Sequence, residues 1–300
     1  MKPLFMWAGG KTKMIKFYNQ SAIMPTAVTT YVEPFFGGGA MFLYVMARYK
    51  PQHAVINDIN PSIVNIYESI KTDVAKFIER VEDLQSQYIP LSKADRKTFY
   101  YKIRHEHAYD YANWTKTYEA ATLYFLMKTG FNGIWQCNKN TNNRFGTPSG
   151  LLTQKTVVYD QDTVMEWHSL LQNTTILCGD WRTTLAQYPD THGSFYYLDP
   201  PYRGSFTSYS QTFTDTDQSD LVTFAKSVGD SSRVILCNDD VGDGFFESKR
   251  GHLNIESYAI KHTAGRRKQT DAGHEAKAVV ELAIHNTVAY DPLRLFDVVE

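Results

Sequence analysis

A chain of 300 residues is long enough for one large α/β domain, or for a core domain that carries an inserted subdomain. Its formal net charge of −1 neither favours nor excludes nucleic acid, because such binding would need a local basic face. It has no run of about 18 apolar residues, so we expect no membrane span and no signal peptide. Its three cysteines, Cys137, Cys178 and Cys237, argue against a disulfide framework or a metal site and fit a reducing cytoplasm.

Short apolar runs predict strands at Tyr31–Phe35, Ala54–Asn57, Thr175–Cys178, Ser194–Leu198, Arg233–Cys237, Leu253–Ile260 and Val279–Ile284. Helical periodicity is clearest over Met41–Arg48, Ile63–Leu84, Tyr118–Met127, Val164–Leu170 and Ser219–Val228. Because strands alternate with helices at both ends, we predict an α/β fold with a mostly parallel, doubly wound, Rossmann-like sheet. The last two strands predict a terminal antiparallel hairpin that closes the sheet edge.

The middle of the chain has a different pattern, with helices and an Asn-rich stretch at 138–144 that predicts an exposed hairpin or loop. We therefore expect an inserted, mainly helical subdomain over residues 71–172. Residues 1–70 and 173–300 would together form the larger domain.

A glycine turn joins the first predicted strand to the first clear helix, with Gly37, Gly38 and Gly39 between Phe35 and Ala40. Such a turn brings a nucleoside cofactor close to backbone N–H groups. The fingerprint for NAD or FAD needs another glycine at position 42, which is Phe42 here. The Phe-x-Gly-x-Gly spacing is that of S-adenosylmethionine enzymes, although a plain tight turn has the same composition.

Two more strand ends carry acids. Asp58 and Ile59 follow the second strand, where a carboxylate commonly binds ribose hydroxyls; capping of the next helix is an equal alternative for such polar residues. Asp180 and Trp181 follow a later strand and either hold an adenine edge or form an ordinary loop. Near the N-terminus, Trp7-Ala8-Gly9-Gly10-Lys11 would close over a cofactor's carboxylate or form a strap that leads into a helix.

The segment Asp199-Pro200-Pro201-Tyr202 ends the fourth predicted strand. Two prolines restrict the backbone there, which gives a stiff corner with an acid, a main-chain carbonyl and an aromatic ring. This corner suits a flat heterocycle with an exocyclic amine, whereas a lone Asp-Pro-Pro is usually only a turn.

Aromatic rings lie among amide and basic side chains over Phe131–Gln136 and 143–150, a composition that suits insertion into a duplex and reading of base edges. Exposed loops can have the same composition. Arg266 and Arg267, in the polar loop before the last strand, would form a patch that contacts phosphates or a solvated charge run.

Together these residues resemble the Dam-type DNA adenine-N6 methyltransferases, over nearly the whole chain from Phe5 to about Ile284. The resemblance is most specific in five motifs that occur in the family's order: Trp7–Lys11, Glu33–Gly39, Asn57–Asn60, Phe131–Gly133 and Asp199–Tyr202. It implies methyl transfer from S-adenosylmethionine to N6 of an adenine flipped out of duplex DNA.

The resemblance also implies roles for individual residues. Asp199, the main-chain carbonyl of Pro200 and Tyr202 would be catalytic: the first two accept the N6 hydrogens and Tyr202 stacks on the base. The cofactor site would consist of Trp7, Ala8, Gly9, Lys11, Phe35, Gly37, Gly38, Gly39, Ala40, Asp58, Ile59, Asp180, Trp181 and Asp199. The DNA-binding residues would be Phe131, Asn132, Gly133, Ile134, Gln136, Asn138, Lys139, Arg144, Pro148, Tyr209, Arg266 and Arg267. No metal and no obligatory protein partner are implied.

The chain departs from GATC-specific relatives at two positions, Gln136 and Leu151, where they carry arginine. Arginine pairs with guanine and glutamine suits adenine, so a target other than GATC is expected unless Lys139 or Arg144 reaches the guanine. A cytosine-N4 methyltransferase and a catalytically silent DNA-binding protein on the same scaffold are the alternatives.

Overall fold

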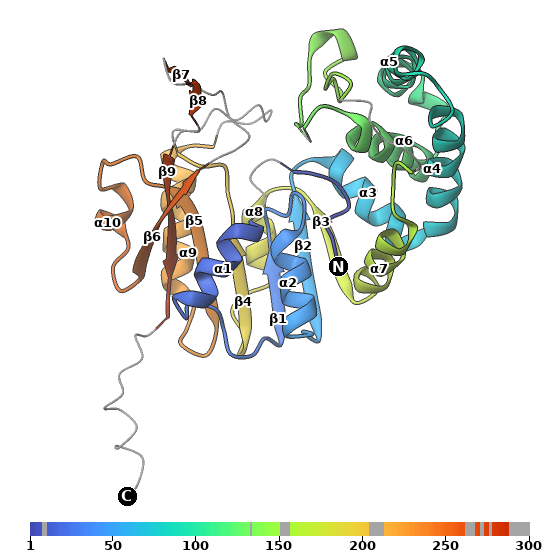
Figure 1. The fold of residues 1–300 in the computed structure, drawn as a ribbon. Helices are drawn as coiled ribbons and strands as arrows, with labels where there is room; N and C mark the ends of the chain where they lie inside the picture. Colours follow the sequence, from blue (N-terminus) through green and yellow to red (C-terminus); the bar gives the residue numbers. More distant parts are fainter. Residues whose placement is uncertain are drawn as a thin grey trace, which may run out of the picture.

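The computed structural model describes residues 1–7, 11–132, 134–150, 157–203, 213–261, 268–270, 273–275 and 278–287. Its main sheet has seven strands in the order β3-β2-β1-β4-β5-β9-β6 (Figure 1). The strands are β1 Thr30–Glu33, β2 His53–Asp58, β3 Thr174–Cys178, β4 Ser194–Leu198, β5 Arg233–Asp239, β6 Asn254–Lys261 and β9 Ala278–His285, with β7 Lys268–Thr270 and β8 Gly273–Glu275 in a small separate sheet.

Strands β1 to β5 pair in parallel, whereas β9 is antiparallel to both β5 and β6. The predicted mostly parallel α/β fold with a terminal antiparallel hairpin is therefore confirmed. Strand β9 inserts between β5 and β6, so β6 forms one edge of the sheet and β3 forms the other.

Each of the five predicted ranges is helical, but one of them is divided between two helices, and four further helices in the part that the structure describes lie outside the predicted ranges. They are α1 Thr12–Gln20, α2 Ala40–Arg48, α3 Pro61–Thr72, α4 Val74–Tyr88, α5 Lys93–Tyr109, α6 Lys116–Thr129, α7 Gln161–Leu171, α8 Trp181–Gln187, α9 Asp215–Ser227 and α10 Phe245–Lys249, with short 3₁₀ turns at Tyr111–Asn113 and Lys139–Thr141. The single helix predicted over Ile63–Leu84 is wrong, because Asp73, with φ −146° and ψ 53°, separates α3 from α4. Helix α5 was not predicted.

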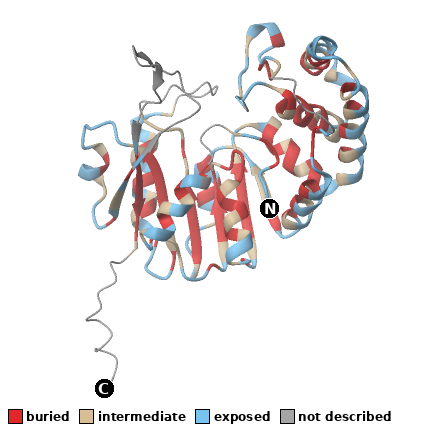
Figure 2. Ribbon diagram, in the orientation of Figure 1, coloured by how far each residue is buried: buried red, intermediate tan, exposed pale blue. Residues whose placement is uncertain are grey.

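Two hydrophobic cores cover the two faces of the sheet. Along β4, Phe195 and Tyr197 belong to the core that includes residues of α1, α2 and α3, whereas Tyr196 and Leu198 belong to the core with α8, α9 and α10. This alternation follows from the two-residue period of a strand. Figure 2 shows the buried strands between partly exposed helices, as expected of a sheet covered on both faces.

Helices α3 to α7 gather beside the β3 edge (Figure 1). Helix α6 packs against α3, α4 and α5, and α7 packs against α3, α4 and β3. This helical region fits the expected insertion, but its boundaries at residues 71 and 172 stay a prediction. No helix in the described part of the chain is long and apolar enough to cross a membrane.

Candidate active site

The glycine turn after β1 is tied to the end of β2. The N–H of Gly37 donates to Asp58 Oδ2 at 2.8 Å, and the hydroxyl of Tyr67 donates to the Gly37 carbonyl at 2.9 Å. Gly37 and Gly39 have φ values of +50° and +67°, in the left-handed region that favours glycine. The turn leads directly into α2 at Ala40. The structure therefore brings together the glycine turn and the acid that the sequence placed in one site.

Asp58 also accepts a hydrogen bond from the Asn60 N–H at 2.9 Å. Burial raises the pKa of its carboxyl, although the N–H groups of Asn60 and Gly37 oppose the shift. The capping role belongs to Asn60, whose side chain accepts from the Ser62 N–H at 3.0 Å at the start of α3. The neighbouring Ile59 is 43% exposed, so it lies at the rim of the site rather than in the core.

Asn57 is a buried residue that the sequence analysis did not assign to the site. Its amide donates to the carbonyls of Pro34 and Gly179, both at 3.0 Å, and so joins the segments that follow β1, β2 and β3. An amide at the end of a buried strand was the available signal.

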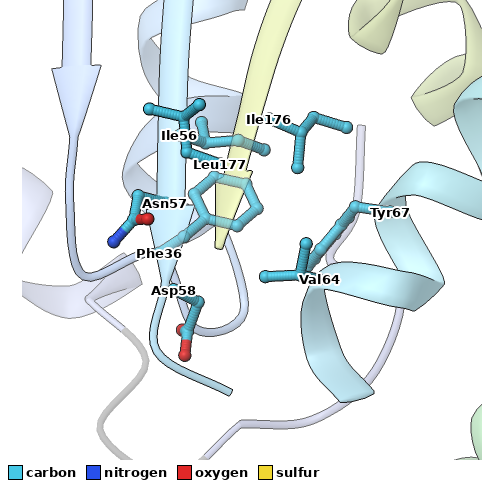
Figure 3. A pocket seen from close by; sticks show the side chains of 8 residues that line it. All are labelled: Phe36, Ile56, Asn57, Asp58, Val64, Tyr67, Ile176 and Leu177. Atoms are coloured by element: carbon cyan, nitrogen blue, oxygen red, sulfur yellow. The ribbon is translucent and has the colours of Figure 1, made fainter. Parts of the chain in front are cut away.

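A shallow hollow lies between α3 and the ends of β2 and β3. Figure 3 shows the side chains that line it: Phe36, Ile56, Asn57, Asp58, Val64, Tyr67, Ile176 and Leu177. Its walls are apolar and aromatic, with a carboxylate and an amide. The side chains leave no room even for a water molecule between them, so a ligand could enter the hollow only if they moved.

The N-terminal segment covers the glycine turn. A Cβ atom on Gly37 would lie 2.6 Å from Trp7 Nε1, and one on Gly38 would lie 2.7 Å from Trp7 Cβ. The Trp7 ring also contacts Trp135, with ring centroids 6.2 Å apart. Ala8 and Gly9 lie outside the described residues. Lys11 is 7% exposed and directly precedes α1, as the predicted helix start required.

The corner after β4 lies beside Lys11. The ammonium of Lys11 is 3.2 Å from Asp199 Oδ1 and 3.2 Å from Glu281 Oε1, and it lies 4.6 Å from the centre of the Tyr202 ring. The Tyr202 hydroxyl donates to Glu281 Oε1 at 2.5 Å. Glu281 is on β9 and was not predicted to belong to the site. A lone acid within the apolar run Val279–Ile284 was the only signal for it.

The electrostatics of this cluster favour a charged lysine. Burial disfavours the charged form of Lys11, but Asp199 and Glu281 outweigh it and raise the pKa of the ammonium. Burial raises the pKa of Asp199, and Glu281 acts in the same direction, whereas Lys11 opposes the shift. An acid with a raised pKa accepts a proton more readily than an exposed aspartate does.

Hydrogen bonds hold the backbone of the corner on both sides of Tyr202. The Gln218 amide donates to the Pro201 carbonyl at 2.8 Å, and the N–H of Arg203 donates to Asn238 Oδ1 at 2.9 Å. The Asn238 amide in turn donates to Gln218 Oε1 at 2.9 Å. Strand β5 and helix α9 thus position a corner that two prolines already restrict.

Asp180 and Trp181 have structural partners at the start of α8. Asp180 Oδ1 accepts from the Arg182 N–H at 2.7 Å and caps the helix. The Trp181 ring lies 6.0 Å from the Phe35 ring, and both contact Phe213. These residues form one wall near the carboxyl ends of the strands.

Residues 130–150, without Gly133, form a hairpin with bridges between Gly130 and Ser149 and between Cys137 and Phe145. Helix α5 anchors it: Arg104 Nη1 donates to the carbonyls of Gly146 and Thr147 at 2.9 and 3.0 Å. Within this 130–150 hairpin the exposed candidates for DNA contact are Phe131, Asn132, Ile134, Gln136, Lys139 and Pro148.

Two other candidates in the hairpin bond to protein groups, Arg144 to α6 and Asn138 within the hairpin itself. Arg144 bonds to Glu119 and stacks on Tyr111, with its guanidinium 3.6 Å from the ring centre. The Asn138 amide donates to the Gly146 carbonyl at 3.4 Å. Gly133, Leu151, Tyr209, Arg266 and Arg267 lie outside the described residues.

Comparison with known proteins finds DNA methyltransferases by both a family model and individual relatives. Residues 7–268 match the model of the D12 class N6 adenine-specific DNA methyltransferases. The type II methyltransferase M.MjaIII of Methanocaldococcus jannaschii is 31% identical over 95% of this chain and 99% of its own length. The retron Ec67 DNA adenine methylase of Escherichia coli is 29% identical, over 99% and 97%. The DNA adenine methylase of Haemophilus influenzae is 28% identical, over 78% of each chain.

Proposed function

Because this chain belongs to the D12 class of N6 adenine-specific DNA methyltransferases, we propose that its Asp199–Tyr202 corner holds the adenine amino group that is methylated. The family assignment favours adenine over cytosine as the target base. The observation that carries the proposal is a corner with an acid, two prolines and an aromatic ring, whose backbone is held at Pro201 and Arg203 by α9 and β5.

The amino group of adenine is a poor nucleophile because its lone pair is delocalised into the ring. In the proposed arrangement, the Asp199 carboxylate and the Pro200 carbonyl each accept one N6 hydrogen, which favours a pyramidal nitrogen with a free lone pair. Tyr202 stacks on the base and fixes its plane. Lys11 contacts Oδ1 of Asp199, so the amino group would approach Oδ2 or displace the lysine. Positioning of this kind can remove a large part of the activation barrier of a transfer reaction.

S-adenosylmethionine supplies an electrophilic methyl group on a sulfonium centre. We place its nucleoside part at the glycine turn, because Asp58 at the end of β2 is hydrogen-bonded to that turn and a carboxylate in this place suits ribose hydroxyls. The remainder would extend towards Trp7, which lies against the glycine turn, and towards Lys11 beside Asp199. Asp180, Trp181 and Phe35 would form the outer wall of the same site.

We further propose that the DNA partner is a duplex and that the 130–150 hairpin contacts it. Phe131 and Ile134 are 39% and 38% exposed, as expected of side chains that fill the gap left by a flipped base. Flipping costs a few kcal/mol, which contacts in the pocket would offset. Gln136 and Lys139 are the exposed candidates for base reading. Arg144 is bonded to Glu119 and is less suited to that role, which favours a target other than GATC.

A reaction on DNA places the protein in the compartment that holds the DNA. We therefore propose the cytoplasm of a bacterial or phage-infected cell, where a stand-alone enzyme of this kind would act.

The Asp199→Ala variant tests the proposal by transfer of a labelled methyl group to duplex DNA in a single turnover. Loss of one group that stabilises developing charge should slow transfer by at least about 100-fold. Binding of S-adenosylmethionine, measured by equilibrium dialysis, should persist. The matched control is Asp162→Ala, an exposed aspartate on α7, which should transfer at the wild-type rate. Wild-type transfer by Asp199→Ala would refute the assignment, and single-molecule sequencing of the product would give the methylated base and its context.

A further inference from the structure

Glu281 is a buried carboxylate in an apolar strand, and the reaction as proposed does not use it. It is 1% exposed and lies on β9, between β5 and β6. A buried charge is costly unless it is paired and hydrogen-bonded. Among the described residues, Glu281 pairs with the Lys11 ammonium and accepts from the Tyr202 hydroxyl, and both groups belong to the candidate site.

The Lys11 ammonium lies at the same distance from two acids. It is 3.2 Å from Asp199 Oδ1 and 3.2 Å from Glu281 Oε1. If Asp199 were the only partner, an adenine amino group that displaced the lysine from Oδ1 would leave a buried ammonium without a carboxylate. With Glu281 present, Lys11 keeps one carboxylate when Asp199 accepts a hydrogen bond from N6.

The second contact of Glu281 acts on the base-stacking ring. The hydrogen bond of 2.5 Å from the Tyr202 hydroxyl fixes the far end of the side chain, while the two prolines restrict its backbone end. The same carboxylate therefore contacts both the ammonium that pairs with Asp199 and the hydroxyl of Tyr202.

We propose that Glu281 is a positioning residue for methyl transfer, which holds Lys11 and the Tyr202 hydroxyl so that Asp199 and the tyrosine ring can receive the adenine. This inference rests on the proposed function of the corner. Glu281 acts through Lys11 and Tyr202 and does not touch the base itself.

The Glu281→Gln variant separates the effect of charge from that of shape. Glutamine keeps an oxygen that can accept the Tyr202 hydrogen bond, but it has no negative charge to balance the Lys11 ammonium. Lys11 then pairs with Asp199 alone. We expect the single-turnover rate at saturating DNA and S-adenosylmethionine to fall about 10- to 100-fold, as for other small misplacements of reacting groups. The dissociation constants of both ligands and the midpoint of thermal unfolding serve as checks on binding and folding.

Glu256→Gln is the matched control. Glu256 lies on the neighbouring strand β6, opposite Ala283, so the same change in charge is made one strand away from the cluster. This variant should transfer at the wild-type rate. A rate for Glu281→Gln equal to that of the control would overturn the inference, because both ligands are saturating and weaker binding cannot hide or cause a difference in rate.

A double-mutant cycle with Lys11→Met supplies a readout that a merely structural residue would not change. If Glu281 acts through Lys11, Glu281→Gln should slow transfer much less in the Lys11→Met background than in the wild type. An equal loss in both backgrounds would overturn the inference. If the wild-type protein transferred no methyl group, the proposed function would be wrong, and this inference would fail with it. Failure of the proposed function can therefore be distinguished from failure of the inference alone.

Discussion

Gly39 offers a quantitative test of how tightly the glycine turn is packed. It precedes α2 with φ +67°, and a Cβ atom there would lie 2.7 Å from the Trp167 ring and 2.8 Å from the Phe36 ring. Neither ring can move freely, because both are buried and the Trp167 Nε1–H donates to the Lys2 carbonyl at 2.9 Å. The Gly39→Ala substitution therefore introduces backbone strain and a clash in the same place.

The two costs can be separated with Gly242→Ala. Gly242 has φ +78°, but a Cβ atom there would have no heavy atom within 4 Å. A left-handed alanine costs about 1 kcal/mol, so Gly242→Ala should lower the free energy of unfolding by that amount. Overpacking of a core adds about 1–3 kcal/mol, which gives a total of about 2–4 kcal/mol for Gly39→Ala.

The assay is thermal unfolding, monitored by circular dichroism. With a shift of about 2 °C per kcal/mol for a chain of this size, Gly242→Ala should lower the midpoint by about 2 °C and Gly39→Ala by about 4–8 °C. Equal shifts for the two variants would refute the packing argument, because only the backbone strain is common to both.

Two further predictions concern a buried acid and the anchor of the hairpin. Burial raises the pKa of Glu33 well above its ordinary value, so between the unfolded and folded pKa values the folded state binds the extra proton and stability falls as the pH rises. Glu33→Gln should therefore stabilise the protein more at pH 8 than at pH 5 in thermal unfolding; a pH-independent effect would contradict this. Arg104→Ala should weaken DNA binding in a gel-shift titration, because it removes the bonds to the Gly146 and Thr147 carbonyls. Lys102→Ala, exposed on the same helix, is its control, and equal affinities for the two variants would count against the anchor.

Much of the fold could be predicted because the parallel strands are short apolar runs that end in polar residues. Helix α5 could not, since its buried residues include Arg96 and His107, and polar side chains break the apolar stripe by which a helix is recognised. The boundary between α3 and α4 was missed because the apolar spacing continues across Asp73, and only the backbone angles there show the break.

The candidate site was predictable where residues adjacent in sequence act together, as in the glycine turn and the Asp199 corner. Its long-range partners were not. Glu281 reaches Lys11 only because β9 inserts next to β5, and that strand order has no local signature. Arg144 looked like a base-reading residue until Glu119, on α6, proved to be its partner.

The contact between Trp7 and Trp135 limits how target specificity can be exchanged among relatives. Trp7 packs on the glycine turn, while Trp135 belongs to the 130–150 hairpin and contacts Phe145 with ring centroids 5.3 Å apart. The hairpin is therefore not an independent cassette. A graft that replaces it to alter the recognised sequence must bring an aromatic ring to position 135, or the transplanted loop will lose its support from the N-terminal strap.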